Sequence, residues 1–246
     1  MKAPMKLAIF DIDGTLTRTT HVDDLSLAAG FGKFLGVHLP RVDWFEFGTS
    51  TDQGLCLAAC RRYLKREPTP DEIAQAKALF LGELRTRIEA DRSLCQCVPG
   101  AKEVFAHLEN AGWKLGVASG AWEQSARTKL GFAGVEVSHL PATFSFAHPE
   151  GRPAEREEIV SGTIAQLLQG APRQHARIVY IGDGVWDARA SRNLGIGFVG
   201  LRHDGDETKL RAEGAGGILR DFLNPQQLLH ELENATVPEG VAILQG

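Results

Sequence analysis

The sequence predicts an α/β protein with a doubly wound, mostly parallel sheet and a helical insertion. Short apolar runs, each ending in a turn rich in glycine or acidic residues, alternate with amphipathic segments along most of the chain. This alternation is typical of βαβ units that build a parallel sheet. The stretch from about residue 17 to residue 98 breaks the rhythm, because it contains helical patterns without convincing apolar strands.

Five apolar runs are the predicted strands. The first is KLAIF at residues 6–10, which ends abruptly at the sequence DIDGT. An apolar run of this length before a glycine turn is typical of a buried parallel strand. The others follow at residues 114–118, 177–181, 196–200 and 217–219.

Helices are predicted between these strands and throughout the insertion. In the core, apolar residues recur at helical spacing over residues 100–112, 154–169 and 187–194. In the insertion, residues 70–90 predict one long helix whose start is marked by Thr69, Asp71 and Glu72. Shorter helices are expected over residues 23–35 and 54–64. We therefore expect a core of residues 1–17 and 98–246, and a helical cap domain of residues 18–97.

The composition is that of an ordinary soluble globular protein. Of the 246 residues, 43% are hydrophobic and 24% are charged, and the formal net charge is −4. This balance does not suggest a general electrostatic attraction to nucleic acid or to an anionic membrane. The apolar runs fall far short of the roughly 18 residues expected of a membrane span, and no N-terminal export signal is visible. We expect a cytoplasmic protein whose four cysteines are reduced.

Two carboxylates follow the first predicted strand at a spacing that suggests a shared role. Asp11 and Asp13 are two residues apart, so in an extended segment their side chains point the same way. Open α/β sheets bind ligands just beyond the carboxyl ends of their strands. Neighbouring carboxylates repel one another unless a cation or a shared proton relieves them. A hard cation with oxygen ligands, above all Mg²⁺, is the expected relief.

Two other predicted strands also end in polar residues. Asp183 ends one of them, between Gly182 and Gly184, and glycines permit the tight turn that brings a carboxylate close to a bound ion. Ser119 ends another, immediately before Gly120. A hydroxyl and backbone N–H groups at such a helix-starting turn are well placed for phosphate oxygens.

These motifs, taken together and in order, resemble the signatures of the haloacid dehalogenase superfamily. The sequence DIDGT at residues 11–15 is similar to the first motif, Ser119 to the second, and GDGVWD at residues 182–187 to the fourth. The segment KLRAEGA at residues 209–215 is also similar to that family. The resemblance spans about two-thirds of the chain and implies a Rossmann-like core with a helical cap of the C1 type inserted after the first motif.

The resemblance also implies roles for individual residues. Asp11 would be the nucleophile that forms an aspartyl-phosphate, and Asp13 the general acid and base. Mg²⁺ would be held by Asp11, Asp183 and the backbone carbonyl of Asp13, with support from Asp187. In an alternative interpretation, Asp187 only forms an ion pair with a nearby arginine such as Arg189. The expected phosphate ligands are Thr15, Ser119 and Gly120.

The third motif is less clear in the sequence. The family usually has a lysine, sometimes an arginine, near the start of the helix before the strand of the fourth motif. Arg156 and Arg152 are both candidates, and Arg156 is favoured because the sequence REEIV at residues 156–160 resembles the pattern of phosphoserine phosphatases. An arginine can hold a phosphate in a two-pronged manner, so it can replace the lysine.

The expected function is Mg²⁺-dependent hydrolysis of a small phosphorylated metabolite. A dehalogenase is disfavoured, because those relatives do not keep a carboxylate two residues after the nucleophile. A phosphonate-cleaving enzyme would need a Schiff-base lysine from the cap, where Lys33 and Lys65 are present in no recognised context. A phosphomutase shares the core residues and stays open as an alternative. A signalling receiver domain is disfavoured by its shorter length and its lack of an equivalent of Asp13.

Overall fold

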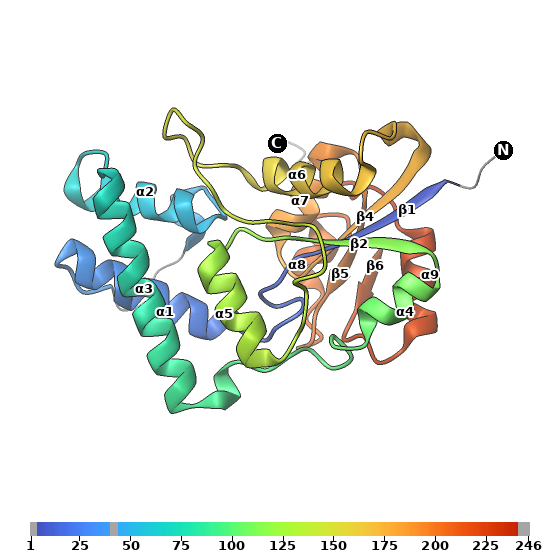
Figure 1. The fold of residues 1–246 in the computed structure, drawn as a ribbon, viewed down its shortest axis with the longest axis horizontal. Helices are drawn as coiled ribbons and strands as arrows, with labels where there is room; N and C mark the ends of the chain where they lie inside the picture. Colours follow the sequence, from blue (N-terminus) through green and yellow to red (C-terminus); the bar gives the residue numbers. More distant parts are fainter. Residues whose placement is uncertain (1–3, 40–43, 241–246) are drawn as a thin grey trace, which may run out of the picture.

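The computed structural model describes residues 4–39 and 44–240. Six strands form one sheet in the order β3-β2-β1-β4-β5-β6, and every neighbouring pair is parallel (Figure 1). The strands are β1 (Met5–Phe10), β2 (Trp113–Ala118), β3 (Ala142–Thr143), β4 (Ala176–Gly182), β5 (Gly197–Leu201) and β6 (Gly217–Leu219). The parallel sheet and all five predicted strands are confirmed. The sequence did not predict β3, because two residues without an apolar run carry no strand signal.

The register of the central strands brings three chain segments together at one edge of the sheet. Phe10 at the end of β1 pairs with Val117 of β2 on one side and with Ile181 of β4 on the other. The segments that leave these strands therefore emerge next to one another. Asp11 continues the ladder, since its backbone N–H donates to the carbonyl oxygen of Ile181 at 2.9 Å.

Alternating residues of β1 fill the two faces of the sheet. Leu7 and Ile9 belong to the hydrophobic core beneath α6, whereas Ala8 and Phe10 belong to the larger core on the opposite face. This is the two-residue period expected of a strand buried on both sides. All four side chains are inaccessible to solvent. The helices that pack on the two faces explain why the strand is apolar from Leu7 to Phe10.

Helices cover both faces of the sheet (Figure 1). The predicted helices are present, although α4 is shorter than the sequence suggested. The ranges of α5, α8 and α9 were not predicted from the sequence, although a helix was expected to start after Ser119. The core helices are α4 (Val104–Asn110), α5 (Glu123–Ala133), α6 (Arg156–Leu168), α7 (Val185–Leu194), α8 (Thr208–Ala212) and α9 (Pro225–Asn234).

Of the four α-helices described between β1 and β2, the first three belong to the insertion, where the sequence predicted helices. They form the group at the left of Figure 1. Helices α1 and α3 pack so closely that a side chain at Gly30 would overlap the backbone of Phe80. The start of α3 is fixed by a capping box, in which Thr69 and Glu72 each accept a hydrogen bond from the other's backbone N–H. The helices are α1 (Thr20–Leu35), α2 (Asp52–Leu64) and α3 (Pro70–Ala90).

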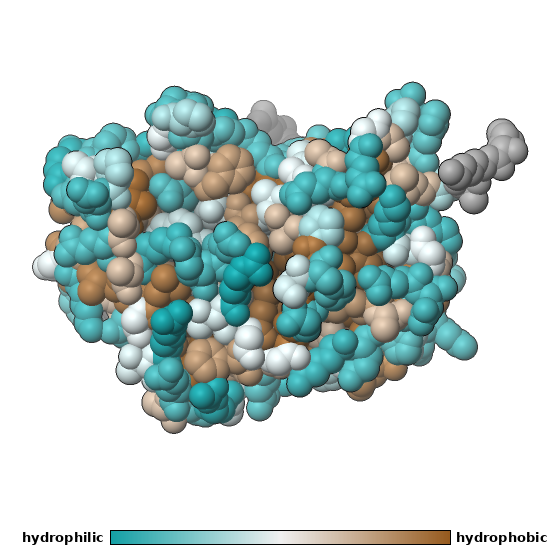
Figure 2. All heavy atoms as spheres, in the orientation of Figure 1, coloured by the Kyte–Doolittle hydropathy of each residue, from teal (hydrophilic) through white to brown (hydrophobic). Residues whose placement is uncertain are grey.

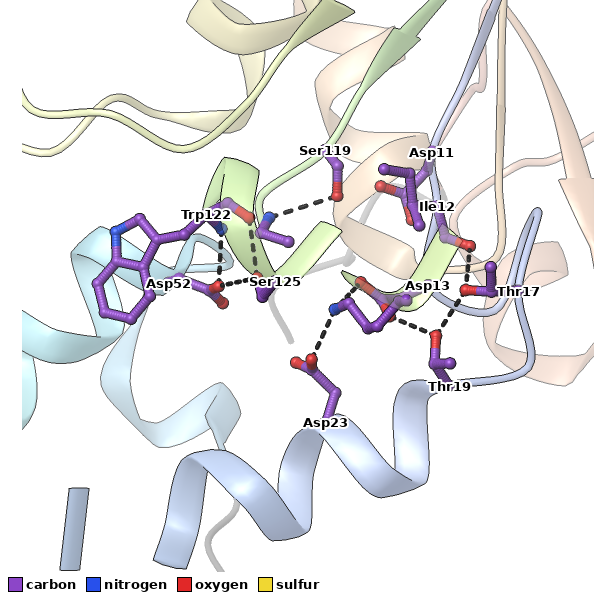
Figure 3. Close-up of polar contacts among 12 residues, drawn as sticks. Asp11, Ile12, Asp13, Thr17, Thr19, Asp23, Asp52, Ser119, Trp122 and Ser125 are labelled. Carbon is purple, nitrogen blue, oxygen red and sulfur yellow. Dashed lines mark hydrogen bonds and ion pairs between the residues drawn. The ribbon is translucent and has the colours of Figure 1, made fainter. Parts of the chain in front are cut away.

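The inserted helices dock on the loop that follows β2. The backbone N–H of Asp52 donates to the carbonyl oxygen of Gly120 at 2.8 Å. In return, the Asp52 carboxylate accepts from the backbone N–H of Trp122 at 2.7 Å (Figure 3). The Trp122 ring packs against Phe31 of α1 and Phe80 of α3. Polar and aromatic contacts together hold the insertion over the carboxyl end of the sheet.

The surface in view is polar over most of its area. Figure 2 shows hydrophilic side chains covering much of this face, with hydrophobic residues visible between them in the middle of the molecule. None of the helices within residues 4–39 and 44–240 combines the length and apolar character needed to cross a membrane.

Candidate active site

The loop after β1 is held in one conformation by its own backbone. The carbonyl oxygen of Ile12 accepts hydrogen bonds from the backbone N–H groups of Thr15, Leu16 and Thr17 at 3.2, 2.8 and 2.9 Å. Gly14 has a φ of +77°, a backbone conformation that residues with a side chain rarely adopt. A Cβ at this position would also overlap the carboxylate of Asp183. The glycine therefore lets the loop pass close to the carboxylate of Asp183, which directly follows β4.

Asp11, Asp183 and Asp187 bring their carboxylates together at this edge of the sheet. Each contributes one oxygen atom to a group whose members lie within 4.8 Å of one another. Asp187, in the first turn of α7, accepts hydrogen bonds from the backbone N–H of Gly184 and from the hydroxyl of Tyr180, both at 3.0 Å. The sequence alternative, an ion pair between Asp187 and Arg189, is not formed, since Arg189 pairs with Glu213.

The electrostatics of this carboxylate cluster favour a bound cation. Burial and the nearby charge of Asp187 raise the pKa of Asp11 to about 7, although Arg156 acts in the opposite direction. Burial, together with Asp187 and Asp11, also raises the pKa of Asp183 well above its usual value. Buried like charges are costly unless an opposite charge compensates them. Three carboxylates in this arrangement fit Mg²⁺, which prefers oxygen ligands.

The Asp13 carboxylate is not part of this cluster, although it lines the same cavity. Its Oδ1 accepts a hydrogen bond from the hydroxyl of Thr19 at 2.6 Å, and its Oδ2 lies 2.6 Å from Nζ of Lys129 (Figure 3). The Asp13 side chain thus contacts Thr19 and Lys129, which lie outside the carboxylate cluster. Coordination of Mg²⁺ by its backbone carbonyl, which the family resemblance implies, stays a prediction.

Arg156 lies in the site and Arg152 does not. Nη1 of Arg156 is 3.1 Å from Oδ1 of Asp11 and 3.6 Å from Oδ1 of Asp187. Nη2 of the same side chain donates to the carbonyl oxygen of Ser50 at 3.1 Å. Arg152 is exposed and pairs with Glu158. Of the two arginines, Arg156 is therefore the one that lies beside Asp11.

The three expected phosphate ligands differ in position. Ser119 and Gly120 both line the cavity at the end of the sheet, whereas Thr15 is not among its lining residues. The Thr15 hydroxyl is buried and forms no hydrogen bond among the described residues. A Cβ at Gly120 would overlap the carbonyl oxygen of Ser50 and crowd the Arg156 guanidinium. Phosphate binding by Ser119 and Gly120 is consistent with their positions, and for Thr15 it stays a prediction.

The cavity in which these groups meet has a volume of about 410 Å³. This is within the size range of sites for small molecules. The core contributes most of the charged side chains that line the cavity, and the insertion contributes both polar and apolar side chains. The residues from the insertion that line it are Thr20, Asp23, Asp24, Leu27, Trp44, Thr49, Ser50, Asp52 and Leu55.

Comparison with known proteins identifies the family. Residues 5–195, more than three-quarters of the chain, match the sequence model of the haloacid dehalogenase-like hydrolases. The chain belongs to the haloacid dehalogenase-like hydrolase family. The chain is also 26% identical to a phosphonoacetaldehyde hydrolase of Pseudomonas fluorescens strain Pf0-1 over 199 residues, which cover 79% of this chain and 69% of that protein.

Solved structures of other hydrolases share the fold. A hydrolase from Pseudomonas syringae superimposes with a TM-score of 0.67 at 20% identity, over 93% of this chain and 98% of that one. A family hydrolase from Deinococcus radiodurans, solved with bound phosphate and sodium, gives a TM-score of 0.53 at 24% identity, over 96% and 99% of the two chains. At these identities the similarity establishes the α/β fold of the hydrolase.

Sequence reasoning missed Arg202, which lines the cavity of this hydrolase, and a buried lysine that pairs with Asp13. Lys129 of α5 is fully buried, and its Nζ lies 2.6 Å from both Asp13 and Asp23. Burial opposes the charged ammonium, but the carboxylates of Asp13 and Asp23 more than compensate, so the pKa of Lys129 is raised. The segment around Lys129 has no motif, and its partners lie 116 and 106 residues away along the chain. No local pattern could have revealed this contact.

The cysteines play no part in the site. Cys56, Cys60 and Cys95 are buried, Cys97 is half-buried, and all four are free thiols. None lines the cavity described above. This agrees with the prediction that the cysteines are reduced.

Proposed function

We propose that this hydrolase cleaves a small phosphomonoester with the help of Mg²⁺, through an aspartyl-phosphate formed on Asp11. One observation carries the proposal. Asp11 and Asp13 line the same cavity but have different surroundings, Asp11 among carboxylates and Arg156, and Asp13 between Thr19 and Lys129. Two carboxylates with distinct environments suit two distinct roles, nucleophile and acid/base catalyst.

The first step transfers the phosphoryl group to the enzyme. A carboxylate oxygen of Asp11 attacks phosphorus, and the bond between phosphorus and the ester oxygen breaks. The departing oxygen takes its electron pair and a proton from Asp13, so that the alcohol leaves and Asp13 becomes a carboxylate. Arg156, 3.1 Å from Asp11, lowers the repulsion between the nucleophile and the anionic phosphate.

The second step returns the enzyme to its starting state. Asp13 takes a proton from water, and the water oxygen attacks phosphorus as the bond to Asp11 breaks. Inorganic phosphate leaves, Asp11 is again a carboxylate, and Asp13 again carries its proton. Mg²⁺, held by Asp11, Asp183 and Asp187 with the backbone carbonyl of Asp13, would draw negative charge from the transferring group.

The lysines of the insertion give no support for a phosphonate-cleaving reaction. The relative from Pseudomonas fluorescens is a phosphonoacetaldehyde hydrolase, and a Schiff-base lysine from the cap is what such a reaction would require. Lys33 is exposed and pairs with Glu83, and neither Lys33 nor Lys65 lines the cavity. Asp13, in contrast, supplies the proton that an alcohol leaving group needs.

A substrate screen tests this proposal directly. Purified protein with Mg²⁺ is offered a panel of phosphorylated sugars, phosphoglycolate, phosphoserine, nucleotides and phosphonoacetaldehyde, and released phosphate and acetaldehyde are measured. Release of phosphate from one or more esters is the expected result. Acetaldehyde from phosphonoacetaldehyde without ester hydrolysis would contradict the proposal, and conversion of a sugar phosphate to its isomer would identify a mutase instead.

Two further measurements test the nucleophile and the metal. Asp11→Asn is expected to abolish turnover while the protein stays folded, because the amide cannot attack phosphorus. A chelator is expected to silence the enzyme, and added Mg²⁺ to restore it. Near wild-type activity in the Asp11→Asn variant, or unchanged activity in excess chelator, would refute the corresponding role.

A further inference from the structure

We infer that Lys129 is a positioning residue that fixes the Asp13 carboxylate for proton transfer and ties it to the first inserted helix. The inference rests on the proposed function, because it concerns the acid/base step of that reaction. Lys129 lies on α5 and is not among the residues that line the cavity. It therefore acts through Asp13 and has no direct contact with substrate.

The geometry around Asp13 leaves its carboxylate little freedom. Thr19 donates to Oδ1 and Lys129 to Oδ2, both at 2.6 Å. Thr19 in turn shares a hydrogen bond of 2.6 Å with Thr17, whose hydroxyl also reaches the carbonyl oxygen of Ile12 at 3.2 Å. Both carboxylate oxygens are thus held by buried partners, so one orientation of Asp13 is selected. Figure 3 shows Asp13 between Thr19 and Asp23 in this network.

The second partner of Lys129 connects the catalytic loop to the insertion. Asp23, in the first turns of α1, lies 2.6 Å from Nζ of Lys129 and is largely buried. The Asp13–Lys129–Asp23 triad therefore joins the loop after β1, the core helix α5 and the inserted helix α1. The Lys129 ammonium thus couples the orientation of Asp13 to the position of α1, in addition to the hydrogen bond from Thr19 at the start of that helix.

A purely stabilising role explains the triad less well. An ion pair out of contact with water costs desolvation energy, and apolar side chains of similar volume often serve stability equally well. Lys129 has no solvent exposure, so it gains nothing from hydration of its charge. A charged group at this position is better explained by the directional hydrogen bonds that it gives to the two carboxylates.

A pair of substrates with different leaving groups separates positioning from mere stability. An alkyl phosphate needs a proton on its departing oxygen, whereas p-nitrophenyl phosphate has a leaving group stable enough to depart without one. The ratio kcat/KM reports the steps up to formation of the aspartyl-phosphate. In Lys129→Met, kcat/KM for the alkyl ester is expected to fall on the order of 100-fold, with only a small change for p-nitrophenyl phosphate. A burst of nitrophenolate is also expected, because the later hydrolysis step slows.

A second variant protects the test against misfolding. Lys129→Met leaves Asp13 and Asp23 facing each other without a cation, which can unfold the protein. The double variant Asp23→Asn/Lys129→Gln removes one negative and one positive charge together and keeps polar side chains of similar size. The same selective loss for the alkyl ester is expected from it. Lys33→Met, which removes an exposed lysine that pairs with Glu83, is the matched control and should leave kcat/KM unchanged for both substrates.

The outcomes distinguish the inference from the function on which it rests. Selective loss for the alkyl ester in either folded variant supports the positioning role. Equal loss for both substrates, no loss, or unfolding of both variants would overturn it and assign Lys129 to structure alone. If the wild-type enzyme releases phosphate from neither ester nor from the wider panel, the proposed function itself fails, and the inference with it.

Discussion

The Asp52 carboxylate accepts a hydrogen bond from the backbone N–H of Trp122 at 2.7 Å, and this contact joins the inserted helix α2 to the loop after β2. The same oxygen accepts from the hydroxyl of Ser125 at 3.3 Å. Asp52 is buried, so these donors have no water to replace it. The loop that carries Ser119 and Gly120 is thus held in place by a residue of the insertion.

Asp52→Ala is expected to destabilise the protein. The substitution leaves the N–H of Trp122 buried without an acceptor, which lowers the free energy of unfolding by about 1–3 kcal/mol. Asp52→Asn keeps an oxygen acceptor at the same place and should lose less. Urea denaturation of the three proteins measures the difference. Equal destabilisation by Ala and Asn would show that the hydrogen bond to Trp122 does not hold the insertion.

Gly14→Ala is expected to weaken Mg²⁺ binding roughly tenfold or more, as is usual when the surroundings of a metal ligand are disturbed. The added methyl group would overlap the carboxylate of Asp183 and push it from its place. Gly36 is a matched control, because its φ of +68° carries similar strain while a Cβ there would meet open space.

Calorimetric titration measures the Mg²⁺ affinity of both variants and of the wild type. Gly36→Ala should lower stability by about 1–2 kcal/mol from backbone strain alone and leave Mg²⁺ affinity unchanged. Equal Mg²⁺ affinity in Gly14→Ala and the wild type would rule out Asp183 as a ligand at this position.

Five of the six strands, and the acidic residues that follow β1 and β4, could be predicted from the sequence. Apolar runs such as residues 6–10 are local signals, and parallel strands necessarily bring their carboxyl ends to one edge. For this reason the sequence alone predicts that Asp11 and Asp183 lie close together. The long helix α3 was predicted with its observed bounds, since Thr69 and Glu72 form a recognisable capping box.

What could not be predicted depends on contacts between distant segments. Lys129 is buried because it pairs with Asp13, in the loop after β1, and with Asp23 of α1. The sequence around residue 129 contains no pattern that predicts either contact. The choice between Arg156 and Arg152 is similar. Both precede or begin the same helix, and only the fold shows that the chain turns Arg152 outward to Glu158.

Arg156→Ala is expected to lower kcat by on the order of 100-fold, the usual loss when a charge-stabilising donor is removed from an active site. Its guanidinium is largely buried and lies 3.1 Å from Asp11, whereas Arg202, which also lines the cavity, pairs with Asp204. Arg152→Ala should leave kcat unchanged, because that side chain forms exposed ion pairs. Steady-state kinetics with the best substrate of the screen decides between them, and a larger loss in Arg152→Ala would reverse the assignment.

Stabilisation by Mg²⁺ is expected to increase with pH. The pKa of Asp11 is about 7 in the folded protein without metal, raised from 3.8 mainly by burial and by Asp187. Between these two values the folded state keeps a proton that the unfolded chain has lost, so the metal-free protein loses stability as the pH rises through this window. Mg²⁺ competes with that proton for the carboxylate, and its binding releases it. Thermal unfolding with and without Mg²⁺ should therefore show a larger increase in Tm at about pH 8 than at about pH 5.5. The dependence should be weaker in Asp11→Asn, which has no proton to release, and a pH-independent shift in the wild type would mean that Asp11 is not a metal ligand.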